Sequence, residues 1–72
     1  MVRVVVNGQP HTLERPISIL ALLHSLGVNP AIVAVGHNGE VVHREAWATT
    51  ILQDGDTLEI VRPVGGGMGV PG

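Results

Sequence analysis

The stretch Ser18-Ile19-Leu20-Ala21-Leu22-Leu23-His24-Ser25-Leu26-Gly27 decides how the rest of this chain can fold. Its apolar side chains recur at i, i+3, i+4 and i+7, on one stripe of an α-helix: Ile19, Leu22, Leu23 and Leu26. Ser18 can cap the first turn through its hydroxyl, and Gly27 suits the C′ position that ends a helix. Pro30 prevents the helix from restarting. The stretch therefore predicts one amphipathic helix, which needs an apolar surface to cover it.

Alternating side chains before this helix predict a strand and its return. Val2, Val4 and Val6 alternate with their neighbours in the manner of a β-strand. Asn7-Gly8 is a hairpin-turn signal, because both residues adopt positive φ readily. Residues 12–14 can then form a short returning strand, which Pro16 ends.

The chain after the helix predicts the remaining strands. Residues 31–35 are a short apolar run typical of a buried strand, and residues 40–42 can form a brief edge strand after the Asn38-Gly39 turn. Residues 43–48 suit a short second helical turn. Residues 57–61 alternate as a last strand, and sheet pairing should fail at Pro63. We expect an α+β domain in which a mixed sheet of about four to five strands carries the one main helix across one face.

Composition excludes several classes of function. The chain of 72 residues is long enough for one domain, and the absence of cysteine excludes disulfides and thiolate metal sites. The formal net charge of −2 and a single aromatic residue, Trp47, argue against nucleic-acid binding. No apolar run approaches the ~20 residues of a membrane helix. We therefore expect a soluble, cytoplasmic protein that is a monomer on its own and does not contact a membrane.

The polar residues form no recognisable catalytic or metal-binding set. The four histidines are scattered along the sequence: His11, His24, His37 and His43. We expect them to be solvated rather than metal ligands. We expect Gln53-Asp54-Gly55-Asp56 to be a tight turn whose carboxylates accept hydrogen bonds from backbone amides. Since no hydroxyl has an evident base and carboxylate partner, we predict no catalytic residues, no metal and no bound cofactor.

The C-terminal segment cannot pack as the rest of the chain does. Gly65, Gly66 and Gly67 lose more conformational entropy on ordering than other residues, and they have no side chains to bury in return. We therefore divide the chain into a folded domain, residues 1–64, and a flexible Gly-rich tail, residues 65–72.

One face of the predicted sheet is a candidate partner surface. With the neighbouring side chains of the first and last strands turned toward the helix, Val5 and Val61 point away from it. Apolar residues grouped on an open sheet face can mark a docking site, although single surface valines are also common. We name Val5 and Val61 as the candidates for partner contact.

Three motifs follow one another at a fairly specific spacing: Arg44-Glu45-Ala46-Trp47, Gln53-Asp54-Gly55-Asp56 and Val64-Gly65-Gly66-Gly67. Together with the order of the elements, they resemble the ubiquitin-like β-grasp sulfur carriers, and within them the ThiS family of thiamine biosynthesis. The resemblance covers nearly the whole chain. It implies a β-grasp fold and a carrier protein rather than an enzyme.

The resemblance also implies a chemistry for the C-terminal end. In that family a ThiF-type adenylating enzyme uses ATP and Mg²⁺ to activate the terminal glycine carboxylate. Sulfur then replaces AMP to give a thiocarboxylate, which delivers sulfur to a ThiG-type thiazole synthase. Carried over to this sequence, the modified residue is Gly67, with Gly66 as the alternative terminus. Gly65, Gly66 and Gly67 then pass into the partner's active site, which glycine suits because it lacks a Cβ.

Residues 68–72 depart from the family pattern, whose members usually end at the double glycine. Met68 to Gly72 mask the reactive carboxylate unless a processing protease removes them. Two alternatives therefore stay open beside the thiamine pathway. One is a processed sulfur carrier for another product, such as cysteine or molybdopterin, and the other is a β-grasp module that binds proteins without covalent chemistry.

Overall fold

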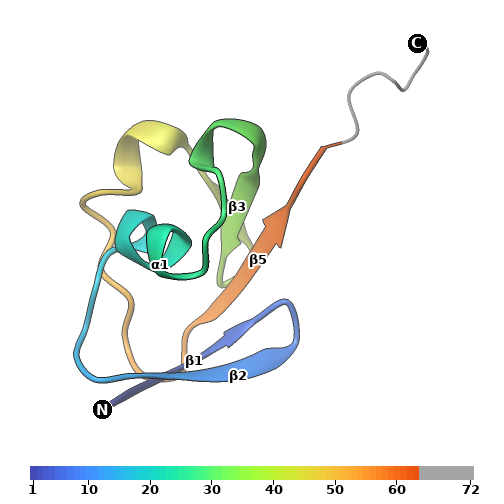
Figure 1. Cartoon of the computed structure of the whole chain (residues 1–72). Helices are drawn as coiled ribbons and strands as arrows, with labels where there is room; N and C mark the ends of the chain where they lie inside the picture. Colours follow the sequence, from blue (N-terminus) through green and yellow to red (C-terminus); the bar gives the residue numbers. More distant parts are fainter. Residues whose placement is uncertain (64–72) are drawn as a thin grey trace, which may run out of the picture.

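A mixed sheet of five strands and one helix build the domain (Figure 1). The computed structural model describes residues 1–63 of the chain. The strands are β1 (Val2–Val6), β2 (Gln9–Leu13), β3 (Ala34–His37), β4 (Glu40–Val42) and β5 (Thr57–Val61). The predicted α+β architecture, with one main helix packed on a mixed sheet, is confirmed.

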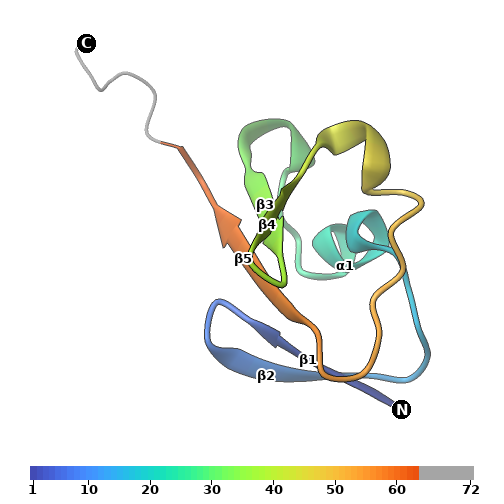
Figure 2. The same ribbon diagram turned by 180° about the vertical axis from the view of Figure 1, so that it is seen from behind.

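The last strand in sequence lies in the middle of the sheet. The strand order is β2-β1-β5-β3-β4, which Figure 2 shows from behind. β5 runs parallel to β1 on one side and antiparallel to β3 on the other. The hairpins β1–β2 and β3–β4 turn through Asn7-Gly8 and Asn38-Gly39, where both asparagines have positive φ.

The helix α1 (Ile19–Ser25) forms where the apolar stripe predicts it. Ser18 Oγ accepts a hydrogen bond from the amide of Ala21 at 3.1 Å, and Gly27 adopts a φ of +73°. Ile19, Leu22 and Leu23 are buried against the sheet. The fourth member of the stripe, Leu26, is the C-cap residue and remains 37% exposed. The helix therefore ends one residue before the stripe does.

The core lies between α1 and the sheet, and its members are aliphatic except for Trp47. The buried side chains are Val2, Val4, Val6, Ile19, Leu22, Leu23, Val33, Val35, Trp47, Leu52 and Leu58. Leu52 belongs to no helix or strand, yet its side chain is completely buried. Its amide donates to the carbonyl of Ile17 at 2.8 Å, which fixes the segment before β5 against the start of α1.

Two predicted strands have different bounds in the structure. β2 begins at Gln9 rather than at residue 12, because the Asn7-Gly8 turn pairs Val6 directly with Gln9. Pro10 is tolerated there because β2 is an edge strand. The predicted strand over residues 31–35 begins later, at Ala34. Before it, Asn29 caps the 3-10 helix η1 (Pro30–Ile32) by accepting from the amide of Ala31.

The predicted helical turn over residues 43–48 is the 3-10 helix η2 (Arg44–Ala46). Within residues 1–63, no helix has the length and apolar character needed to cross a bilayer. The proposed boundary between residues 64 and 65, and the tail itself, lie outside the described residues.

Candidate functional site

The sheet face turned away from α1 carries a hollow beside the C-terminal half of β5. It has a volume of about 160 Å³, and it is lined by Ala34, Val35, Gly36, Val41, Glu59 and Val61. The sheet register explains this grouping, because Ala34 pairs with Val61, and Gly36 pairs with both Val41 and Glu59. Directly opposed residues point to the same face of a sheet.

The hollow is apolar and accessible. Val41 is 74% exposed and Val61 is 55% exposed, on either side of the less exposed β3. Gly36 lies in the middle of the hollow, where a Cβ would meet the side chain of Glu59 at an ordinary contact distance of 3.8 Å. The packing therefore does not demand glycine at this position, and its effect is to keep the middle of the hollow low.

The two residues predicted for partner contact share a face but are not together. Val5 pairs with Thr57 at the start of β5, while Val61 lies at its end. Val5 is half-buried, and Val61 is exposed. The structure thus groups Val61 with Ala34 and Val41 rather than with Val5.

Sequence reasoning missed Ala34, Gly36 and Val41 as members of this surface. The Asn38-Gly39 turn does carry a signal, because a hairpin closed at that dipeptide pairs Gly36 with Val41. The pairing of β3 with β5 joins residues far apart in the sequence, and no local pattern specifies its register.

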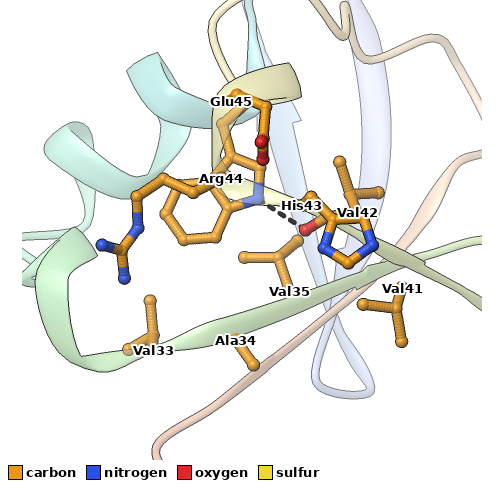
Figure 3. Close-up of a pocket in the computed structure, with 9 residues that line it drawn as sticks. Val33, Ala34, Val35, Val41, Val42, His43, Arg44 and Glu45 are labelled. Carbon is orange, nitrogen blue, oxygen red and sulfur yellow. Dashed lines mark hydrogen bonds between the residues drawn. The ribbon is translucent and has the colours of Figure 1, made fainter.

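A second hollow, of about 320 Å³, lies where η2 meets β3 and β4 (Figure 3). Trp47 forms part of its wall, and its Nε1 donates to the carbonyl of Val42 at 2.9 Å. The Arg44 guanidinium lies 5.7 Å from the centroid of the Trp47 ring, and Arg44 Nη2 donates to the carbonyl of Ala31 at 3.3 Å. The motif Arg44-Glu45-Ala46-Trp47 therefore fastens η2 to β4 and to η1.

The acidic motif before β5 also stabilises the fold. Asp54 Oδ1 accepts from the amide of Arg3 at 2.8 Å, and the amide of Gly55 donates to the carbonyl of Arg3 at 2.7 Å. Asp56 Oδ2 accepts from the amide of Gln53 at 2.8 Å. The prediction of a tight turn whose carboxylates accept hydrogen bonds from backbone amides is confirmed.

His37 is not the solvated histidine that we expected. Its Nε2 lies 2.8 Å from Asp56 Oδ2, and the two side chains are 21% and 13% exposed. Burial alone raises the pKa of Asp56, but hydrogen bonds from Gln53, His37 and Asn38 outweigh it and hold that pKa below its usual value. Within residues 1–63, no three histidine or carboxylate side chains gather in a group that could hold a metal ion.

The residues predicted for the chemistry, Gly65, Gly66 and Gly67, lie outside the described part of the chain. The structure instead defines where the chain leaves the sheet. β5 ends at Val61, and the exposed residues Arg62 and Pro63 follow. The apolar hollow borders this end of β5.

A helix laid across a mixed sheet whose first and last strands run parallel at its centre defines the β-grasp class of α+β domains. The chain belongs to the ThiS family, whose family model matches residues 4–67. The match includes the three motifs quoted above and stops at Gly67. The predicted resemblance is therefore confirmed.

Relatives and solved structures agree with this assignment. The sulfur carrier protein ThiS of Escherichia coli K12 is 31% identical over 65 residues, which are 90% of this chain and 98% of that protein. The crystal structure of a thiamine biosynthesis protein (ThiS) from Geobacter metallireducens superposes with a TM-score of 0.83 at 38% identity. That superposition covers 92% of this chain and 100% of the other.

Two longer relatives contain a region similar to this chain. The thiazole synthase of Magnetococcus marinus is 38% identical over 69 residues, which are 96% of this chain and 21% of that protein. The thiazole synthase of Paramagnetospirillum magneticum is 40% identical over 65 residues, which are 90% of this chain and 20% of that protein. The chain thus spans about a fifth of the length of these thiazole synthases.

Proposed function

We propose that this chain is a sulfur carrier of thiamine biosynthesis, serving the formation of the thiazole moiety. The observation that carries the proposal is the family match through Gly67 on a domain whose fold superposes on a thiamine biosynthesis protein. The regions of likeness within thiazole synthases support a ThiG-type thiazole synthase as the acceptor of the sulfur. The chain acts as a co-substrate of other proteins and not as an enzyme.

The proposed reaction takes place at the carboxylate of Gly67, once residues 68–72 have been removed. A ThiF-type adenylating enzyme with ATP and Mg²⁺ joins this carboxylate oxygen to the α-phosphorus of ATP, and pyrophosphate leaves. Sulfide then attacks the carbonyl carbon, so that a C–S bond forms, the C–O bond to the phosphate breaks and AMP leaves. The net change is the exchange of one oxygen for one sulfur. Gly66 is the alternative terminus.

We place the docking of the adenylating enzyme on the open sheet face around Val61, with Ala34, Gly36 and Val41. Six residues, 62–67, follow the end of β5 up to the carboxylate of Gly67, and fully extended they span at most ~20 Å. A partner that receives the chain end must therefore lie near the end of β5. The exposed apolar hollow borders that end. Val5, at the start of β5, is proposed to lie at the margin of the contact.

Intact mass spectrometry tests the proposed function. The full chain and a form ending at Gly67 are each incubated with a ThiF-type enzyme, ATP, Mg²⁺ and sulfide. A form ending at Gly66 is treated in the same way. We expect only the form ending at Gly67 to gain the mass difference between sulfur and oxygen, whereas modification of the form ending at Gly66 alone would identify Gly66 as the reactive terminus. If no form is modified, the sulfur-carrier function is refuted.

A second candidate function is a processed carrier for another sulfur pathway, such as cysteine or molybdopterin synthesis. Met68 to Gly72 favour it, because members of the ThiS family usually end at the double glycine and this chain continues beyond it. Sulfur transfer from the loaded form to a thiazole synthase, but not to enzymes of the other pathways, supports the thiamine assignment. Protein from its native cells that remains uncleaved and unmodified supports a binding module without covalent chemistry.

A further inference from the structure

The side chain of Asn7 holds the end of β5. Asn7 Nδ2 donates to the carbonyl of Ile60 at 3.1 Å, and the amide of Ile60 donates to Asn7 Oδ1 at 2.8 Å. One side chain amide thus satisfies both backbone groups of Ile60. The Asn7 backbone amide also donates to the carbonyl of Leu58 at 2.9 Å.

Asn7 acts where the backbone of β1 can no longer reach β5. The parallel pairing of β1 with β5 stops at Val6 and Leu58. Asn7 then enters the hairpin turn with a φ of +50°, so the chain of β1 leaves its neighbour. The Asn7 side chain extends the ladder to Ile60. On this side of β5, it therefore fixes Ile60, the residue that precedes Val61, Arg62 and Pro63.

Asn38 provides a matched arrangement at the opposite end of the same strand. It also precedes a glycine and has a φ of +51°. Asn38 Oδ1 accepts from the amide of Thr57 at 2.8 Å, and Asn38 Nδ2 donates to Asp56 Oδ1 at 3.2 Å. Both Asn-Gly turns therefore hold β5 through side chains, Asn38 at its first residue and Asn7 near its last.

We propose that Asn7 is a positioning residue that directs the chain end into the site of the adenylating enzyme. The inference rests on the proposed sulfur-carrier function. A chain end that must enter another protein's active site gains from a fixed starting direction, because residues that the sheet already orders lose less conformational entropy when the domain docks. Without the Asn7 amide, β3 alone holds the residues Ile60 and Val61 within the sheet.

The turn itself does not require an asparagine side chain. Glycine adopts positive φ without strain, so Asn7→Gly and Asn38→Gly keep both turns and remove only the side-chain bonds. These variants form a matched pair. Asn38 bonds to the carboxylate of Asp56, and hydrogen bonds to charged groups stabilise more than neutral ones. An account based on stability alone therefore predicts that Asn38→Gly is the more harmful change.

The experiment measures adenylation of the form ending at Gly67. Pyrophosphate release by a ThiF-type enzyme with ATP and Mg²⁺ gives kcat/KM for the wild type and for each variant. We expect Asn7→Gly to lower kcat/KM by about tenfold, while Asn38→Gly stays within about twofold of the wild type. Asn7→Asp keeps the acceptor for the Ile60 amide but loses the donor, so an intermediate value is expected.

Amide hydrogen exchange gives a second readout that does not depend on the enzyme. In Asn7→Gly, the Ile60 amide loses its acceptor and should exchange about fivefold faster or more, whereas the Thr57 amide should do so in Asn38→Gly. The urea midpoint, followed by Trp47 fluorescence, shows whether each variant is folded.

The outcomes separate the two proposals. If the wild type itself is not adenylated, the sulfur-carrier function is wrong. If the wild type is adenylated and Asn7→Gly is affected no more than Asn38→Gly, the positioning role of Asn7 is wrong and the proposed function stands. Unchanged exchange of the Ile60 amide in Asn7→Gly would equally overturn the positioning role.

Discussion

Removing the exposed methyl groups of the open sheet face should weaken docking without harming the fold. We consider the double variant Val41→Ala with Val61→Ala. Because these side chains are 74% and 55% exposed, their truncation removes little packing within the domain. A docked partner would cover them. At ~0.8 kcal/mol per buried methyl-sized group, truncating each partly covered valine should weaken the binding free energy by about 1 kcal/mol. The double variant should therefore bind about 2 kcal/mol more weakly, which is an increase of about thirtyfold in Kd.

Isothermal titration calorimetry with a ThiF-type adenylating enzyme measures this effect directly. Ile32→Ala is the matched control, because Ile32 is 46% exposed and belongs to η1 outside the hollow. The control should bind as the wild type does, and Val61→Glu alone should weaken binding by placing a carboxylate in the contact. A double variant that binds within about twofold of the wild type, against the about thirtyfold expected, would refute the placement of the docking face. A control that binds as poorly as the double variant would refute it too.

Three further predictions concern the domain that presents this face. Leu52→Ala should cost about 2–5 kcal/mol of a total stability of roughly 4–10 kcal/mol, because Leu52 is completely buried; urea unfolding followed by Trp47 fluorescence measures this loss. Trp47→Phe should cost about 1–3 kcal/mol by leaving the Val42 carbonyl without its donor, as measured by circular dichroism. Since hydrogen bonds hold the pKa of Asp56 below 3.8, its ionised form stabilises the fold above that pH, and the contribution is lost as the pH falls through the native pKa. Asp56→Asn should therefore flatten the decline in urea midpoint on acidification.

Local sequence signals were sufficient to predict most elements of the fold. Ser18 caps α1 as its hydroxyl predicts, and both Asn-Gly dipeptides form the expected hairpin turns. These features depend on neighbours in the sequence, and for that reason they can be read from it. The exception at residues 30–35 is local too, because the Asn29 cap and Pro30 favour a 3-10 helix over an early strand.

The features that the sequence did not reveal depend on contacts between distant residues. Leu52 carries no periodic pattern, and it is buried where backbone contacts of residues 50–52 with residues 17–19 hold its segment against the start of α1. The neighbours of Val61 on the open sheet face follow from the register of β3 with β5, which a single sequence does not specify. His37 meets Asp56 because the β3–β4 turn and the turn before β5 come together at one end of the sheet.

The family motifs within the folded domain and the proposed chemistry belong to different parts of the chain. Trp47 and Asp54 make hydrogen bonds to backbone groups of other elements, so two of the three motifs quoted for the family act by fixing the fold. The fold in turn places β5 at the centre of the sheet, held along one side by β3 and on the other by β1 and Asn7. A central strand is the element whose end the domain can hold most firmly. A carrier whose reactive group lies a few residues beyond that end therefore gains the most from leading its chain out through β5.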